Sequence, residues 1–355
     1  MNAPAPPVPA PIARDAGLTF PFVQAAAPGT WREVAPGIYW LRMPLPFALD
    51  HINLWVLRDG PGWTLIDTGL NSEPTRAHWE QVFTEGLAGR PVERVIVTHY
   101  HPDHFGLAGW LTHRFGVELW ITEAEYLTAL AYHAPLLNFT NLAAAELFVR
   151  HGLDVATLES VRNRKHSYPK AVGDPPQSFH RILDGDTLTI DGRGWRVIVG
   201  TGHAPEHAAL YCEELEVLIS GDMVLPKIST NVSVWPSEPE GDPLALFLRS
   251  VDRYARLPED TLVLPSHGLP FRGLRLRASA LQRHHAARLD ELLGACERPA
   301  SAWDVVPVLF RRQLDTHQIF FAMGEAIAHL NHLLYQGRVT REEGADRVLR
   351  FMRST

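Results

Sequence analysis

The feature that most constrains this sequence is a cluster of metal-binding residue types at residues 98–106, which read Thr-His-Tyr-His-Pro-Asp-His-Phe-Gly. The cluster directly follows a short apolar run, for which we predict a strand. Side chains alternate along an extended chain, so His99, His101 and Asp103 are expected to share one side, and His104 follows from the turn into the next helix. We therefore expect the cluster at the end of a sheet, where α/β folds usually place their sites.

Further residues of the same chemical types follow other predicted strands. Apolar runs at 195–200, 216–219 and 261–264 each end a few residues before one of them, and neighbouring glycines permit tight turns. These residues are His203, Asp222 and His267. Imidazole and carboxylate ligands without a thiolate favour Zn²⁺, and the oxygen donors also suit Mn²⁺ or Fe. The seven side chains together predict one site that holds two metal ions.

The expected ligands can be divided between the two ions. The first ion is expected to bind His99, His101 and His203, the second Asp103, His104 and His267, and Asp222 is expected to bridge them together with a water molecule. Two cations about 3.5–4 Å apart would hold that water as hydroxide near neutral pH. Asp67 follows another predicted strand and is expected to accept a hydrogen bond from a ligand imidazole. For His207 we predict a structural hydrogen bond and no metal.

Composition excludes several classes of protein. The chain has 355 residues, of which 46% are hydrophobic and 21% charged, as in ordinary globular proteins. Its net charge of −7 gives no overall attraction for nucleic acid or an anionic membrane. Only two cysteines occur, at 212 and 296, so we expect no disulfide framework. No apolar run approaches the roughly 18 residues of a membrane span, and the N-terminus lacks the pattern of a secretory signal. We expect a cytoplasmic protein without membrane association.

The order of the candidate ligands along the chain resembles the five motifs of the metallo-β-lactamase superfamily. The motifs correspond here to Asp67, His99-x-His101-x-Asp103-His104, His203, Asp222 and His267. The resemblance covers residues 30 to 275 and implies an α/β fold, an αββα sandwich of two mixed β-sheets with flanking helices and a dinuclear site along one edge. It also implies the ligand assignment given above.

Two positions distinguish subgroups of that family. His101 stands where the flavodiiron relatives carry Glu, which disfavours dioxygen reduction. Asp222 supplies a bridging carboxylate that true β-lactamases usually lack, which disfavours antibiotic hydrolysis. The pattern is closer to glyoxalase II, the quorum-quenching lactonases and the tRNA-processing nucleases.

Three segments are predicted along the chain. Residues 1–17 form a flexible tail rich in Ala and Pro, and residues 18–297 form the catalytic domain. A helical insert at about 122–172 either caps the active site or packs away from it, and both alternatives stay open. Residues 298–355 resemble the small winged-helix-like tail of related endoribonucleases. In this tail we expect a capping box at Ser301, a helix with one apolar face, and a final short helix after Gly337. The apolar face consists of Phe320, Met323, Ile327, Leu330 and Leu334.

The leading hypothesis is a dinuclear hydrolase of a small-molecule acyl compound, namely a thioester, lactone or ester. The bridging hydroxide attacks the carbonyl carbon, with Asp103 and Asp222 as the catalytic carboxylates; Asp103 orients the nucleophile and accepts its proton. Tyr100 is expected at the mouth of the site, and Lys227 either meets an anionic substrate group or is a solvated surface residue. The alternative is a metal-dependent phosphodiesterase acting on RNA, which the tail favours and the acidic charge disfavours. A non-catalytic binding protein is the third reading. The apolar face of the tail is available for nucleic acid or for a homodimer.

Overall fold

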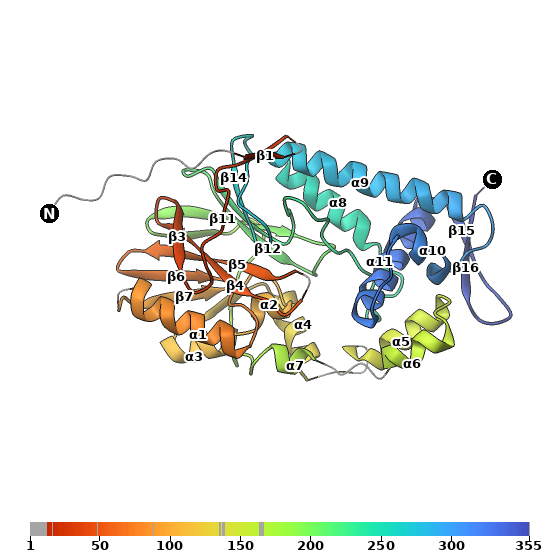
Figure 1. Cartoon of the computed structure of the whole chain (residues 1–355), viewed down its shortest axis with the longest axis horizontal. Coiled ribbons are helices and arrows are strands. Elements are labelled where there is room, and N and C mark those ends of the chain that lie inside the picture. The colour runs from red at the N-terminus through yellow and green to blue at the C-terminus, as the bar shows by residue number, and fades with distance from the viewer. Residues whose placement is uncertain are drawn as a thin grey trace.

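The structure, a computed structural model, describes residues 13–15, 17–47, 49–87, 89–134, 136, 139–162 and 167–354. Two mixed β-sheets pack face to face, and helices cover the outer face of each sheet (Figure 1). A further group of helices and a hairpin lies beside the sandwich at the C-terminal end of the chain (Figure 1). This architecture confirms the αββα sandwich and the C-terminal helical region expected from the sequence.

The first sheet has seven strands that follow one another in chain order. They are β3 (Trp31–Ala35), β4 (Ile38–Pro44), β5 (His51–Asp59), β6 (Gly62–Ile66), β7 (Val92–Ile96), β8 (Leu119–Ile121) and β9 (His180–Arg181). Neighbours pair antiparallel from β3 to β6 and parallel from β6 to β9. The carboxyl ends of β6 and β7 therefore meet at one edge of the sheet.

The second sheet has five strands, also in chain order. They are β10 (Thr187–Ile190), β11 (Arg193–Gly200), β12 (His207–Cys212), β13 (Val217–Gly221) and β14 (Leu262–Pro265). Only β13 and β14 pair in parallel; the other neighbours are antiparallel. A second pair of carboxyl ends, those of β13 and β14, thus lies at one edge of this sheet.

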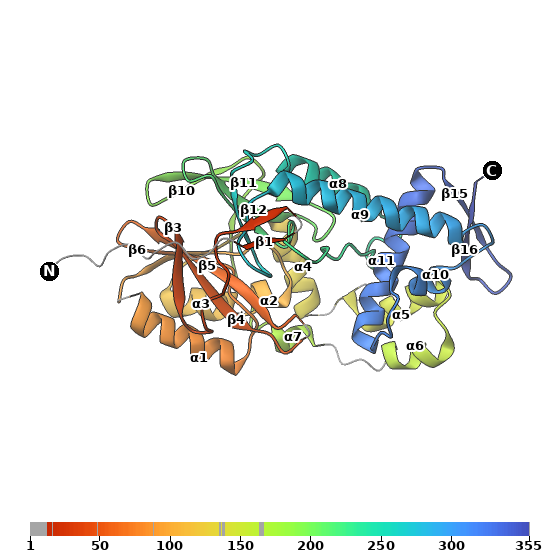
Figure 2. The same ribbon diagram turned by 45° about the horizontal axis from the view of Figure 1, so that its top comes forward.

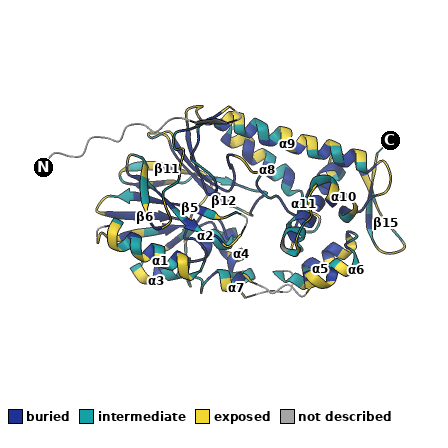
Figure 3. Ribbon diagram, in the orientation of Figure 1, coloured by how far each residue is buried: buried dark blue, intermediate teal, exposed yellow. Residues whose placement is uncertain are grey.

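Alternating apolar residues divide the interior into layers. Along β4, Ile38 and Trp40 point between the sheets, whereas Leu41 and Met43 point to the helices outside. The outer face of the first sheet packs on α1 (Glu73–Gln81), the π-helix Val82–Gly86, α3 (Ala108–Phe115) and α4 (Glu123–His133). That of the second sheet packs on α8 (Pro243–Tyr254) and α9 (Leu274–Ala295). Figure 3 shows central strands such as β5 and β12 largely buried and the outward faces of α1 and α9 exposed.

The C-terminal region contains α10 (Ala302–Leu309), α11 (Thr316–Tyr335) and a hairpin of β15 (Val339–Glu343) and β16 (Leu349–Arg353). The predicted capping box is confirmed, between Ser301 and Asp304. The predicted final helix is wrong, because Leu349 and Phe351 alternate with more exposed residues and pair as a strand. The expectation that the apolar face of α11 is available to a partner also has to be corrected. The apolar residues of α11 lie within the protein's own core, so that face is not available for RNA or a second chain.

The insert is divided between two parts of the molecule. Helices α4 and α7 (Tyr168–Ala171) stay with the first sheet, whereas α5 (Asn141–Arg150) and α6 (Val155–Arg162) lie beside the C-terminal region (Figure 2). Phe148 of α5 and Val161 of α6 share one hydrophobic cluster with Val305 and Phe320. The insert therefore connects the sheet sandwich to the C-terminal helices.

The N-terminal prediction is corrected in part. Residues 13–15 form strand β1 (Ala13–Asp15), which pairs with β2 (Leu18–Phe20), so the predicted flexible tail does not extend through them. Residue 17 lies in the turn between these strands, and residues 1–12 and 16 of the predicted tail lie outside the described residues. No helix within the described ranges combines the length and apolar character needed to cross a membrane.

Candidate metal centre

The ends of five strands bring the predicted ligands and Asp67 to one edge of the sandwich. Asp67 directly follows β6, and His99 lies three residues beyond β7. In the second sheet, Asp222 follows β13, His267 lies two residues beyond β14, and His203 three residues beyond β11. Parallel pairing aligns the carboxyl ends of β6 with β7 and of β13 with β14, which is why residues far apart in the sequence meet here.

Helix α2 (Pro102–Phe105) and its N-terminal cap supply the other candidate ligands. His101 is its N-terminal cap and Pro102 its first residue, where the fixed φ of proline favours a helix start. One turn then places Asp103 and His104 on the same side as His99. The structure thus brings all seven predicted side chains together.

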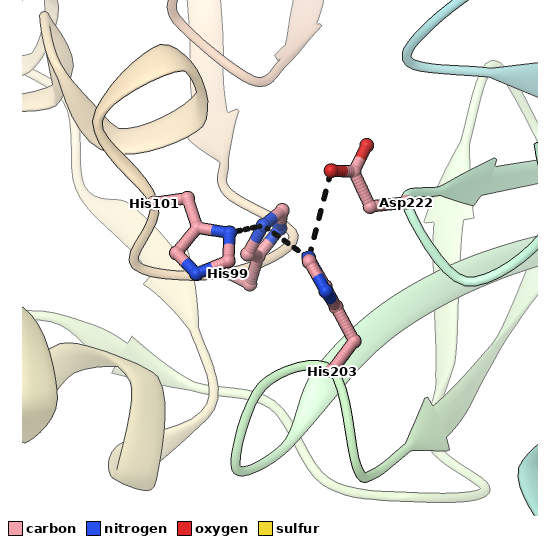
Figure 4. A group of neighbouring side chains, drawn as sticks. All are labelled: His99, His101, His203 and Asp222. Atoms are coloured by element: carbon pink, nitrogen blue, oxygen red, sulfur yellow. Dashed lines mark hydrogen bonds and ion pairs between the residues drawn. The ribbon is translucent and has the colours of Figure 1, made fainter. Parts of the chain in front are cut away.

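The side chains form two groups in which the potential ligand atoms lie within 4.8 Å of one another. The first group is His99, His101, His203 and Asp222, and the second is Asp103, His104 and His267 (Figure 4 shows the first). Asp222 also reaches the second group. Its Oδ2 is 3.5 Å from Nε2 of His203, and its Oδ1 is 3.5 Å from Nε2 of His104 and 3.4 Å from Nε2 of His267. This position between the groups is the one predicted for a bridging carboxylate.

Hydrogen bonds to the far nitrogen orient three of the imidazoles. Nδ1 of His104 donates to Oδ2 of Asp67 at 2.8 Å, and the other Asp67 oxygen accepts the backbone N–H of Thr98 at 2.8 Å. Nδ1 of His203 donates to the carbonyl of Asn231, and Nδ1 of His267 to that of His51, both at 2.8 Å. These acceptors hold a proton on Nδ1 and fix the orientation of each ring, so that each Nε2 is directed at the cluster.

Two buried polar atoms at the centre indicate that a cation belongs there. Nε2 of His104 and Oδ1 of Asp222 are buried, and neither has a hydrogen-bond partner of good geometry among the described residues. Buried polar atoms without a partner are rare and costly. A metal ion would satisfy both atoms, so the residues present fit the group that the donor set implies.

The pKa shifts divide the cluster into neutral and charged side chains. Burial and the neighbouring imidazoles together hold the pKa of His99 and of His101 well below the ordinary value, so both rings are neutral. Burial alone would raise the pKa of Asp222, but the His267 and His104 imidazoles outweigh it and hold this pKa well below the usual range. Neutral imidazole and ionised carboxylate are the forms that bind cations.

Although burial opposes it, the Asp67, Asp103 and Asp222 carboxylates raise the pKa of His104 well above its ordinary value, and Asp222 and Asp103 raise that of His267. A bound cation would take the place of the protons on these two rings.

Two further residues support the ligand-bearing loops. His207 accepts the backbone N–H of Asp222 through Nε2 at 3.1 Å, which confirms its predicted structural role. Glu125 of α4 was not predicted. Its carboxylate accepts the backbone N–H of Tyr100 at 3.0 Å and that of Glu206 at 2.6 Å, so it joins the loop after β7 to the loop after β11. Burial raises the pKa of Glu125 to about 8.

A cavity of about 540 Å³ opens beside the ligands His101 and Asp103. Its walls come from several segments, including the insert and α11, and are largely apolar and aromatic. Among the lining residues are Phe47, Tyr100, Tyr132, Phe139, Trp235 and Phe321. A second cavity of about 290 Å³ lies on the side of His203. Lys227 is exposed and is not among the residues that line either cavity, so its predicted contact with substrate stays a prediction.

Comparison with known proteins gives three kinds of match. A family model described as "Metallo-beta-lactamase superfamily" matches residues 48–267, and one described as "Metallo-beta-lactamase-like, C-terminal domain" matches residues 289–354. A solved structure, a beta-lactamase domain protein from Burkholderia ambifaria, is 52% identical with a TM-score of 0.90, over 95% of this chain and 98% of that one.

Curated relatives are more distant. The "Probable metallo-hydrolase YqjP" of Bacillus subtilis (strain 168) is 26% identical over 309 residues, which cover 84% of this chain and 93% of that protein. The "Acyl-coenzyme A thioesterase MBLAC2" of Gallus gallus is 24% identical over 197 residues, or 54% of this chain and 65% of that protein.

The first family model spans more than half of the chain, and the Burkholderia structure matches nearly all of it. The fold and the cluster of His and Asp side chains at the edge of the two sheets agree with both. The chain therefore belongs to the metallo-β-lactamase superfamily and is a metal-dependent hydrolase.

Proposed function

We propose that this protein hydrolyses a small acyl compound, a thioester, lactone or ester, whose acyl group is apolar. The observation that carries the proposal is the cavity of about 540 Å³ beside His101 and Asp103. Its size lies within the range of about 300–1,000 Å³ that is usual for small-molecule sites. An apolar acyl chain in this cavity would place its carbonyl carbon at the metal centre.

The character of the walls supports an apolar group over a charged one. Tyr100 stacks on Tyr132 with ring centroids 5.4 Å apart, and Trp235 contacts Phe321 at 6.3 Å. The lining residues that the structure describes include no Lys or Arg in either cavity. Recognition of an RNA backbone relies on such cations. The printed name of the Gallus gallus relative, an acyl-coenzyme A thioesterase, also supports a thioester.

We further propose that the site holds two divalent ions, with zinc the ion that the donor set favours. His99, His101 and His203 would hold one ion, Asp103, His104 and His267 the other, and Asp222 would contact both. Bound there, the ions would supply Lewis-acid activation of a water molecule and of the substrate carbonyl. Asp103 borders both the ligand cluster and the large cavity, so its carboxylate is placed to orient the water and accept its proton.

A substrate panel tests the proposal. The zinc-loaded protein would be assayed with acyl-CoA thioesters of increasing chain length, aryl esters, lactones, β-lactams and single-stranded RNA, beside a measurement of bound metal. We expect hydrolysis of acyl substrates, rising with chain length, and its loss after chelation or in His101→Ala. Cleavage of RNA without hydrolysis of any acyl compound would contradict the proposal and support the phosphodiesterase alternative.

Variants of the cavity wall test where the acyl chain binds. Phe321→Ala should shift the preferred chain length upward, and Ala171→Phe should shift it downward. Each methylene gained or lost in an apolar pocket is worth about tenfold or more in kcat/KM. Leu276→Ala is the matched control, because Leu276 is exposed on α9 away from the cavity. Unchanged chain-length profiles in both wall variants would place the acyl group elsewhere.

A further inference from the structure

The C-terminal region reaches the metal centre through one loop, residues 230–234, which lies between α11 and the ligand His203. The backbone N–H of Val234 donates to the carbonyl of Gly324 on α11 at 3.0 Å. At the other end of the loop, the Thr230 hydroxyl donates to the backbone carbonyl of Asp222. The loop is therefore anchored to α11 on one side and to a metal-ligand residue on the other.

Asn231 is the central residue of this loop. Its backbone carbonyl accepts the Nδ1–H of His203 at 2.8 Å. Its side-chain amide donates to Oε2 of Glu325 at 3.2 Å, and its amide oxygen accepts the Ser233 hydroxyl at 2.8 Å. Both ends of the amide are thus held, which fixes the orientation of the whole residue and of the carbonyl that His203 contacts.

Glu325 is the residue of the C-terminal region whose side chain contacts Asn231. It lies on α11 between Gly324, which accepts from the loop backbone, and a run of buried residues that pack in the core. The core packing of α11 fixes the position of the Glu325 carboxylate. The packed helix α11 therefore presents, from its middle, a carboxylate that contacts Asn231, and Asn231 contacts His203.

We propose that Glu325 is a positioning residue for the metal centre, which acts through Asn231 on the imidazole of His203. The C-terminal region is then part of the metal site although it supplies no ligand. When the Glu325 contact is lost, Ser233 holds the Asn231 amide from one end only, and the carbonyl that accepts Nδ1–H of His203 is held less firmly. The ring can then rotate or carry its proton on Nε2, which prevents ligation. This inference concerns metal binding and does not depend on which substrate is hydrolysed.

The test is the zinc affinity of purified variants, measured by competition with a chromophoric chelator. Glu325→Ala should lower the affinity of one zinc ion by about tenfold, the lower end of the range for groups that orient a ligand. Glu325→Gln should restore it, because the Gln oxygen can still accept from Asn231. Glu342→Ala is the matched control, an exposed glutamate on β15 of the same region, and should match the wild type.

A double-mutant cycle separates positioning from general loss of stability. Asn231→Ala already removes the side chain that Glu325 contacts. In that background, Glu325→Ala should therefore cause no further loss of zinc affinity. If Glu325→Ala does not fold, Glu325→Asp shortens the side chain while keeping its charge and takes its place. Wild-type zinc affinity in these variants, or an equal loss with and without Asn231, would overturn the proposal.

Discussion

At the scale of single residues, Asp67 lies behind the cluster and fixes the orientation of His104, one of the proposed metal ligands. It adopts φ of 61°, a left-handed conformation that is uncommon for a residue other than glycine. In this conformation one carboxylate oxygen accepts the Thr98 backbone N–H, and the other accepts Nδ1–H of His104. Each of the two Asp67 oxygens therefore has to accept a hydrogen bond. A carboxylate can do this with both oxygens, whereas an amide can do it with one.

Asp67→Asn should therefore weaken metal binding at the group that contains His104. The amide keeps one acceptor for Thr98 and turns a donor toward His104, which favours the ring tautomer with a proton on Nε2. We expect a decrease of about 10–100-fold in zinc affinity, measured by chelator competition. Asp260→Asn, at an exposed position, should leave the affinity unchanged. Equal affinities for both variants would contradict the orienting role of Asp67.

The sequence predicted the ligand cluster because its chemistry is local. Four of the candidate ligands lie within six consecutive residues after a strand: His99, His101, Asp103 and His104. The other three, at 203, 222 and 267, are also His or Asp. Glu125 was missed because its contacts are not local. It accepts backbone N–H groups 25 and 81 residues away, and a backbone donor leaves no trace in the sequence. The contact between Glu325 and Asn231 was missed for the same reason, because the two residues are 94 positions apart in the sequence.

At the scale of elements, α11 is constrained where it meets the loop of residues 230–234. A Cβ atom on Gly324 would lie 2.8 Å from Cβ of Ser233, closer than such atoms approach in proteins. Gly324→Ala should therefore push the loop away and destabilise the protein by about 1–3 kcal/mol, as overpacking usually does. The loss outweighs the gain in helix propensity, and chemical denaturation would measure it.

Gly294 provides the matched control. It is exposed within α9, and a Cβ at this position would meet no atom within 4 Å. Gly294→Ala should stabilise the protein by up to about 1 kcal/mol, the difference in helix propensity between the two residues. The two Gly→Ala substitutions are thus expected to change the free energy of unfolding in opposite directions. Stabilisation by both would show that the loop does not rest on α11.

The contact between α9 and α11 includes a buried histidine pair. Nδ1 of His285 lies 3.2 Å from Nε2 of His329, and burial lowers the pKa of His285 to about 3 and that of His329 to about 4. Both values lie below the ordinary value of about 6.5, so the folded protein favours the neutral rings. Their contribution to stability is complete above pH of about 6.5 and is lost as the pH falls toward 4.

His285→Phe should therefore make stability less sensitive to acid. Between pH 6.5 and 5, the free energy of unfolding of the wild type should fall more steeply than that of the variant, by a difference in slope that rises to about 1.4 kcal/mol per pH unit near pH 5. Urea denaturation with a chelator present would measure this, because metal release then makes no contribution. His113→Ala, at an exposed position on α3, should keep the wild-type slope. Identical slopes in all three proteins would exclude the pair as an acid-sensitive element.

Elements were predicted where one periodicity ran without interruption. The three-and-four spacing of α11 is of this kind. The capping box at Ser301 was predicted from a short local motif. Helix α8 was missed although Leu244, Phe247, Val251 and Tyr254 form a buried face at helical spacing. The final hairpin was mistaken for a helix because only Val339, Leu349 and Phe351 show its alternating pattern. Short strands with one buried face carry too few residues for the period to be clear.

At the scale of the whole molecule, helices α5 and α6 of the insert and the C-terminal region share one hydrophobic core with the second sheet. A single hydrophobic cluster contains residues of that sheet, of α8 and α9, of α5 and α6, and of α10 and α11. The predicted boundary at residue 297 lies close to residue 289, where the match to the C-terminal family model begins, and this cluster contains residues on both sides of it. Sequence patterns located these segments but not their packing, because an apolar helix face does not specify which surface covers it.

The consequence can be tested by two truncations. Removal of residues 298–355 would expose Phe148 and Val161 of the insert and Leu292 of α9, which are buried, and would remove one wall of the large cavity. We expect this truncated protein to bind a hydrophobic dye, to unfold without a cooperative transition and to lose tight zinc binding. Exposed apolar surface of this extent is characteristic of incompletely packed proteins.

Removal of residues 337–355 alone is the matched comparison. It deletes the hairpin, and with it the buried side chains of Val339 and Phe351, but keeps α11 and the contacts of Glu325 with the loop. This protein should unfold cooperatively at a lower temperature and retain zinc affinity close to the wild type. If the longer truncation also folds cooperatively and binds zinc normally, the C-terminal region is an independent unit. If the shorter one loses zinc, the hairpin rather than α11 supports the metal centre. The expected order, with folding and zinc binding lost only when α11 is removed, follows from where the shared core lies.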